Sequence, residues 1–305
     1  MQRHHIYFTL LVLVIFASIA EGQSPRTAED YYNRAAVSHK KGDIDDAIAD
    51  FTRAIEFSSR PGDPRRGGDG AFNLDQVKVL DPLTALAYSN RGLMRYLKGD
   101  FDGAIDDCTR ALKINPRLAD AYNHRGISRS AKGDFDAALS DLNRALTIDS
   151  RSACAFNNRG TVYTKQGAND RAIADFDRAI ELNPHPTEAY YNRGFVRRLK
   201  GDRQGALRDF DRALAINPRL ALAHYQRGAI WFDLEDLERA IPEFNCAIEL
   251  DPQLAIAYAN RGLALLRQGK DLEAEQDISR ALALDPLLKT ELEQRIALVK
   301  QQRQK

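Results

Sequence analysis

Small residues return along this chain at a fixed interval of 34 residues. The clearest series is made of glycines that follow one another without a slip: Gly92, Gly126, Gly160, Gly194, Gly228 and Gly262. Two alanine series keep the same interval: Ala104, Ala138, Ala172, Ala206, Ala240 and Ala274, and Ala111, Ala145, Ala179, Ala213, Ala247 and Ala281. A period of this length is typical of arrays in which every unit is one supersecondary element.

Within each unit the pattern predicts two antiparallel helices. Glycine in the first helix, opposite alanine in the second, allows the two backbones to approach closely. Large apolar side chains fill the space between them: Phe51, Leu142, Phe176, Phe210, Phe244 and Ile278. A glycine that can adopt the left-handed conformation ends the first helix: Gly42, Gly99, Gly133, Gly167, Gly201 and Gly269. A following aspartate such as Asp100 can cap the second helix, and a proline such as Pro116 separates the units.

This combination of small residues, aromatic residues and prolines resembles the tetratricopeptide repeat (TPR) family. The resemblance implies an all-α fold, a right-handed α-solenoid superhelix of seven two-helix units. The seven repeats are expected at residues 28–61, 85–118, 119–152, 153–186, 187–220, 221–254 and 255–288. The sequence departs from the pattern at Ser59 and Ser150, which replace the proline, and at Glu235, which replaces the turn glycine.

The segments outside the repeats divide the chain further. We expect a signal peptide at residues 1–22, an N-terminal segment with repeat 1 at 23–61, and a Gly/Pro/Arg-containing insertion at 62–84. Repeats 2 to 7 then occupy residues 85–288, and a capping helix occupies 289–305. In that tail Leu292, Ile296 and Val299 share one helical face, which suits a helix that covers the apolar end of an array. A dimerisation helix is the alternative.

The first residues predict export. A basic start, MQRHH, precedes a run from Ile6 to Ala20 that contains no charge, and small residues follow it. This is the layout of a secretory signal peptide, which predicts a periplasmic or secreted protein. The alternative is an uncleaved membrane anchor, but the apolar run is shorter than the ~20 residues that a spanning helix needs. Cys108, Cys154 and Cys246 lie in separate repeats, so we expect buried free thiols rather than disulfides.

Composition and length restrict the function. Lys and Arg number 44 against 43 Asp and Glu, so no basic excess is available for nucleic acid. The seven repeats and the signal peptide leave 45 of the 305 residues, too few for a catalytic domain. Outside the signal peptide, the histidines lie in separate repeats without the spacing of metal ligands. We therefore expect no enzyme activity, no cofactor and no metal.

Arginine and carboxylate residues also recur with the repeat. Arg91 and Asp107 represent the two series, one in each helix of the unit. Such a series could bind a polyanion, or it could form a ladder of ion pairs within and between repeats. Because the two signs are present in equal numbers, the internal ladder is the favoured interpretation.

The concave groove that the family resemblance implies is the candidate binding surface, lined mainly by the first helices. A series of asparagines falls on it: Asn33, Asn90, Asn158, Asn192 and Asn260, with His124 and Gln226 at the equivalent positions. These amides could pair with the backbone of an extended peptide, or they could brace neighbouring helices. Apolar residues join them in repeats 5 to 7, some of which we expect in the core: Tyr191, Phe195, Leu222, Tyr225, Phe232, Ile256, Leu263 and Leu266.

The sequence thus predicts an exported, non-enzymatic scaffold that holds a protein or peptide in its groove. One alternative is an adaptor or assembly factor of an outer-membrane or secretion complex. Another is a co-chaperone that binds a C-terminal carboxylate. The co-chaperone is disfavoured because Tyr32 and Ala36 stand where that clamp requires Lys and Asn.

Overall fold

The computed structural model describes residue 25 and residues 27–58 and 82–303, and every secondary-structure element in these residues is a helix. The predicted signal peptide lies outside the described residues, as does most of the predicted insertion. Contacts divide the chain into two units, residues 1–166 and 167–305, and each unit is described by itself. The all-α prediction is confirmed, and within each unit most of the helices form packed pairs.

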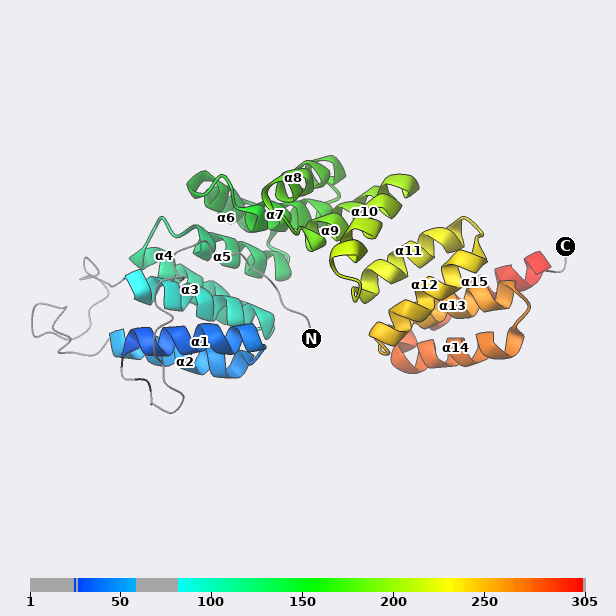
Figure 1. Ribbon diagram of the computed structural model, residues 1–305, viewed down its shortest axis with the longest axis horizontal. Helices are drawn as coiled ribbons and strands as arrows, with labels where there is room; N and C mark the ends of the chain where they lie inside the picture. Colours follow the sequence, from blue (N-terminus) through cyan, green and yellow to red (C-terminus); the bar gives the residue numbers. More distant parts are fainter. Residues whose placement is uncertain (1–24, 26, 59–81, 304–305) are drawn as a thin grey trace, which may run out of the picture. The chain divides into compact units, whose positions relative to one another are not determined.

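In its described residues, the first unit contains three helix pairs and one further helix (Figure 1). The pairs are α1 (Ala28–Lys41) with α2 (Ile44–Ser58), α3 (Pro82–Leu97) with α4 (Phe101–Ile114), and α5 (Ala119–Ala131) with α6 (Phe135–Ile148). The further helix is α7 (Ala153–Lys165), which packs on α6. Residues 82–84 belong to α3, whereas we placed them in the insertion. Proline is well tolerated in the first turn of a helix, where its missing N–H has no helical partner to lose.

The second unit continues with the same arrangement. Its helices are α8 (Asn169–Leu182), α9 (Thr187–Leu199), α10 (Arg203–Ile216), α11 (Ala221–Asp233), α12 (Leu237–Leu250), α13 (Ala255–Arg267) and α14 (Asp271–Leu284). A short 3₁₀ turn, η2 (Pro286–Leu288), leads into α15 (Lys289–Arg303). The pairs α9/α10, α11/α12 and α13/α14 pack together, and α15 packs on α13.

The turn between the two helices of a pair follows the predicted chemistry. Gly99 has a φ of 82°, and the Asp100 side chain accepts a hydrogen bond from the backbone N–H of Gly103 to cap α4. Glu235, which replaces the glycine, keeps the same left-handed backbone with a φ of 61°. A non-glycine residue is disfavoured there by ~1–2 kcal/mol, so the packing of α11 against α12 imposes this turn.

The helix pairs cross where the small residues predicted it. A Cβ atom added at Gly194 would lie 3.0 Å from Cε1 of Phe210 and 3.1 Å from Cβ of Asp209. At Gly92 the corresponding neighbour is Sγ of Cys108, at 2.8 Å. Cys108 therefore takes the core position that Phe210 has in its own repeat, and both side chains are fully buried.

The three thiols differ in their surroundings. Burial raises the pKa of Cys108 to about 12, so this thiol is unreactive at neutral pH. Cys154 is exposed and Cys246 is half-buried. The prediction of buried thiols is therefore right for Cys108. It is wrong for Cys154, which lies in the first turn of α7 with its side chain exposed, and Cys246 is only partly buried.

Candidate functional site

The arginines of the first helices form an internal ladder. Arg91 donates to both carboxylate oxygens of Asp107, from Nε at 2.8 Å and Nη2 at 2.7 Å. Its Nη1 also donates to Oγ1 of Thr52 in the preceding repeat, at 2.9 Å. The same bidentate ion pair, from Nε and Nη2 to the two carboxylate oxygens, joins four other pairs: Arg34 and Asp50, Arg125 and Asp141, Arg193 and Asp209, and Arg261 and Asp277. The predicted ladder is confirmed at these positions, where the guanidinium groups are engaged within the protein.

The asparagines of the first helices brace adjacent repeats. We count positions from the first residue of a repeat, so that Asn90, Asn158 and Asn260 are at position 6. The Nδ2 of Asn90 donates to the hydroxyl of Tyr32 at 2.8 Å, and the Nδ2 of Asn158 donates to Oδ1 of Asn123 at 2.9 Å. The Nδ2 of Asn260 donates to the hydroxyl of Tyr225 at 3.1 Å. In each case the acceptor is at position 5 of the preceding repeat.

These bonds favour the bracing interpretation of the asparagine series over the peptide-binding one. A peptide backbone would have to compete with a bond that already exists between two helices. His124 continues the series, because its Nδ1 lies 3.1 Å from Oγ and 3.2 Å from the carbonyl oxygen of Ser89. Asn33 and Asn192 are half-buried in the corresponding positions.

The predicted apolar residues fall into three classes. Tyr191 and Phe195 are half-buried, whereas Tyr225 is 7% exposed and Phe232 is 6% exposed. Leu263 and Leu266 are also buried. By contrast, Leu222 and Ile256, at position 2 of repeats 6 and 7, are 43% and 39% exposed. Within α11 and α13, the exposed large apolar side chains thus lie at the beginning of each helix.

The tail helix α15 explains part of this burial. Leu292 and Val299 of α15 are 2% and 3% exposed and belong to the same apolar cluster as Tyr225 and Phe232. The guanidinium carbon of Arg295 lies 5.9 Å from the centre of the Phe232 ring. Burial raises the pKa of Tyr225, and the charge of Arg295 opposes this rise. The sequence identified the apolar face of α15 but not the surface that it covers.

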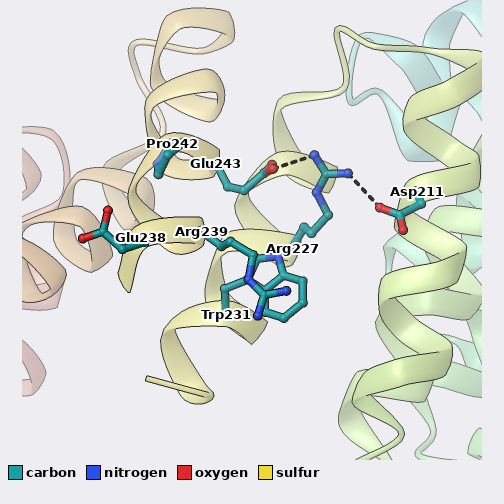
Figure 2. Close-up of a pocket in the computed structure, with 7 residues that line it drawn as sticks. All are labelled: Asp211, Arg227, Trp231, Glu238, Arg239, Pro242 and Glu243. Carbon is teal, nitrogen blue, oxygen red and sulfur yellow. Dashed lines mark hydrogen bonds and ion pairs between the residues drawn. The ribbon is translucent and has the colours of Figure 1, made fainter. Parts of the chain in front are cut away.

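A shallow pocket of about 380 Å³ lies beside α10, α11 and α12 (Figure 2). Its lining residues are Asp211, Arg227, Trp231, Glu238, Arg239, Pro242 and Glu243. Arg239 stacks over Trp231, with its guanidinium carbon 3.6 Å from the ring centre. Arg227 donates to Asp211 at 2.7 Å and to Glu243 at 2.5 Å. The sequence analysis missed this pocket, although Trp231 is the single tryptophan of the chain.

Arg227 joins two of the pocket carboxylates, Asp211 and Glu243, in ion pairs. Burial alone would raise the pKa of Glu243, but hydrogen bonds from His224 and Arg227 lower it overall. Residues 25, 27–58 and 82–303 contain no group of three or more His, Cys, Asp or Glu side chains that could hold a metal ion. Within the same ranges, no helix has the length and apolar character to cross a membrane.

Comparisons with solved structures show the same fold. A tetratricopeptide repeat protein from Parabacteroides merdae is 20% identical, with 90% of this chain and 98% of that one covered at a TM-score of 0.58. PilF of Pseudomonas aeruginosa is 21% identical, with 70% and 94% covered at a TM-score of 0.61. The hetero-tetramer Cut9–Hcn1 is 17% identical, with 88% and 55% covered at a TM-score of 0.64. A search of curated proteins gives no match.

Family models match along most of the sequence. Models described as tetratricopeptide repeat match residues 28–60, 85–118, 119–152, 153–186, 187–220 and 255–286, and one described as TPR repeat matches 228–269. These matches cover far more than half of the 305 residues, and the helix pairs agree with them. The chain belongs to the tetratricopeptide repeat family.

Proposed function

We propose that this protein is a non-enzymatic scaffold that binds a protein or peptide segment on the groove face of its second unit. The groove face is the surface of α9, α11 and α13 at positions 2, 5, 6, 9 and 12 of their repeats. The observation that carries the proposal is the exposure of Leu222 and Ile256. They occupy the same position on two first helices that contact each other, so their exposed side chains recur along one surface.

Other features of the second unit support this choice of surface. Phe195, at position 9 of α9, is half-buried and so presents part of its ring on the same face. Contiguous exposed apolar side chains on a soluble protein mark a binding surface more often than scattered ones do. The arginines of the ladder cannot serve as a binding surface without breaking existing ion pairs, which leaves the groove face as the candidate.

The protein itself can identify the partner. A photo-crosslinking amino acid at Leu222 reports on the groove face, and one at Leu272 is a matched control, because Leu272 is 75% exposed on α14. The full chain carrying either probe is irradiated in its native cells, and the adducts are identified by mass spectrometry. We expect a discrete protein adduct from position 222 that position 272 does not form. Identical adducts from both positions, or none from 222, would contradict the proposal.

We also propose that the protein is exported and that residues 1–22 are removed. The support is the sequence alone: a basic start, a short apolar run and small residues around Ala20 and Gly22. An adaptor role in an outer-membrane or secretion complex is a narrower form of this proposal. Sequencing the N-terminus of the mature protein tests it. We expect a new terminus after Ala20 or Gly22, and an intact Met1 on membrane-bound protein would reject cleavage.

A further inference from the structure

Equivalent residues of repeats 2 and 7 differ in exposure. Leu93 and Leu263 are both leucines at position 9 of a first helix. Leu93 is half-buried, whereas Leu263 is fully buried. At position 6, Asn90 and Asn158 are half-buried, but Asn260 is only 5% exposed. Something beyond the repeat itself therefore covers this part of repeat 7.

The covering element is α15. It packs on α13, and its buried residues Leu292 and Val299 join the cluster that contains Leu263, Leu266 and Phe232. The guanidinium of Arg303 donates to Asp271 at the start of α14, which holds the end of α15 near this repeat. The apolar positions 9 and 12 of the first helix thus lie beneath α15.

The helix α15 is in register with the repeats but packs differently from a first helix. Lys289 follows Ala255 by 34 residues, so Leu292 and Val299 correspond to Tyr258 and Leu265 of α13. Leu292 and Val299 are buried, whereas Tyr258 and Leu265 are half-buried. In addition, α15 exposes positions 5, 6 and 9, which are buried in α13. The apolar side of α15 is therefore turned toward the groove face.

Arg295 supports this orientation. It corresponds to Arg261, whose guanidinium forms the bidentate ion pair with Asp277 in the second helix of its repeat. The guanidinium of Arg295 instead lies over the Phe232 ring of repeat 6 and within 3.4 Å of Glu291 in its own helix. Thus α15 behaves as a ligand on the groove face rather than as the first helix of a further repeat.

The packing around this helix leaves one polar atom unsatisfied. Oδ1 of Asn260, on the helix that α15 packs against, is buried and has no hydrogen-bond partner among the described residues. Leu298 of α15 is 52% exposed and contributes little apolar contact. The ion pair between Arg303 and Asp271 is solvent-exposed, with side chains 34% and 62% accessible, and such pairs stabilise weakly.

We propose that α15 is a displaceable internal occupant, and that the surface beneath it binds an amphipathic helix of a partner protein. The partner helix carries apolar residues at the spacing of Leu292, Ile296 and Val299, together with a hydrogen-bond donor for Asn260. The inference rests on the proposed function, because both use the groove face. It extends that function to the covered half of the face and to its regulation, since displacement of α15 enlarges the surface available for binding.

Hydrogen exchange on the full chain tests displacement directly. A displaceable α15 opens without unfolding the repeats, so we expect its amides to exchange at least tenfold faster than those in the middle of α13 and α14. Exchange of α15 at the same rate as α13 would identify it as a permanent cap and overturn the proposal. This measurement needs no substitution and cannot fail through misfolding.

A peptide tests the site beneath. The probe is a fluorescent peptide of residues 286–303, offered to the full chain and to a variant with Leu292→Asp and Val299→Asp. Two carboxylates in the apolar contact release α15, so we expect the variant to bind the peptide at least tenfold more tightly than the unmodified chain. Leu298→Asp is the matched control, because this residue is exposed and the change should leave peptide binding as in the unmodified chain.

Two further expected results and two contrary ones complete the test. The peptide carrying the same two aspartates should not bind, and Phe232→Ala should weaken binding of the unmodified peptide. Equal affinity of the released variant and the unmodified chain, with unchanged thermal melting, would overturn the proposal. A concentration-dependent dimer that disappears in the released variant would assign the site to a second copy of the chain and overturn the separate partner.

The proposed function and this inference fail in different ways. Leu222 remains 43% exposed with α15 in place, so crosslinking from it reports on the open part of the groove face. Peptide binding without any adduct from Leu222 would leave the inference standing and remove the proposed site. An adduct from Leu222, together with slow amide exchange throughout α15, would support the proposed site and overturn the inference about α15.

Discussion

The first helices of repeats 2 and 3 differ from those of repeats 6 and 7 in the burial of position 9. In the first unit, Leu93 and Ile127 at position 9 are half-buried. In the second unit, Ala229 at the same position is 3% exposed and Leu263 is fully buried. The repeat therefore determines which way a side chain points but not how much solvent it meets. A helix contributed from outside the repeats makes that difference.

Truncation of the two leucines should give the largest contrast. Leu263→Ala removes a fully buried side chain, so we expect it to lower the free energy of unfolding by ~2–5 kcal/mol. Leu93→Ala should cost clearly less, because its side chain is half-buried and solvent can fill part of the space. Urea unfolding of both variants measures the difference. Equal losses would show that α15 does not add to the burial of repeat 7.

The helix crossings should behave alike in both regions, because they lie inside each repeat. Gly92→Leu and Gly194→Leu place a side chain against Cys108 and Phe210, where even a Cβ would lie 2.8 Å and 3.0 Å from the nearest atom. We expect each change to destabilise the protein by at least the ~1–3 kcal/mol typical of overpacking. Thermal melting gives the readout, and an unchanged curve for Gly194→Leu would show that the repeat register is wrong.

Position 6 is occupied by a titratable residue, His124, in repeat 3 and by asparagine in repeats 2, 4, 5 and 7, so its contribution to stability depends on pH in repeat 3. Burial lowers the pKa of His124 from its ordinary value of 6.5, while Asp120 and the bond to Ser89 oppose this effect. The unfolded state therefore binds a proton first as the pH falls. The stability that His124 contributes is full above pH 6.5 and is lost as the pH falls through the lower folded pKa.

Asparagine occupies the same position in other repeats, which makes His124→Asn a matched substitution. Because asparagine does not titrate, the melting temperature of the variant should fall less than that of the unmodified chain between about pH 7 and about pH 5. Melting curves across this range provide the test. Parallel decreases for the two proteins would assign the pH dependence to other groups.

The exposed end of the groove face should show the smallest effect on stability. Leu222→Asp with Ile256→Asp changes two exposed side chains, so we expect each to alter the free energy of unfolding by no more than ~0.5 kcal/mol. Capture of the partner identified by crosslinking should fall at least tenfold. Leu272→Asp is the control, with capture unchanged. A variant that melts normally and retains full capture would place binding elsewhere.

The fold was predictable because its signals are local. The turn glycines, of which Gly99 is one, need only their own backbone conformation, and Asp100 caps the helix that follows it. Gly92 lies 34 residues before Gly126, and this spacing alone identifies the repeat. Each signal acts over a few residues or recurs at a fixed distance, so it can be read without knowledge of the packing.

The site was less predictable because its properties are set by distant neighbours. Asn260 belongs to a clear series, but whether its amide binds a peptide or braces a helix depends on Tyr225, 35 residues away. Phe232 is aromatic on a groove-facing position, yet it is covered by residues of α15. The stacking of Arg239 on Trp231 leaves no periodic trace in the sequence.

The sequence by itself determined the helix pairs, their turns, their crossings and the pairing of the arginine and carboxylate series. The tertiary structure decided which apolar residues of the groove face remain open, as Leu222 does, and which are closed, as Leu263 is. The physical reason is that helix ends and helix crossings follow from steric and hydrogen-bonding requirements within one repeat. Exposure instead depends on every element that packs against a residue, and α15 reaches the groove face from outside the repeats.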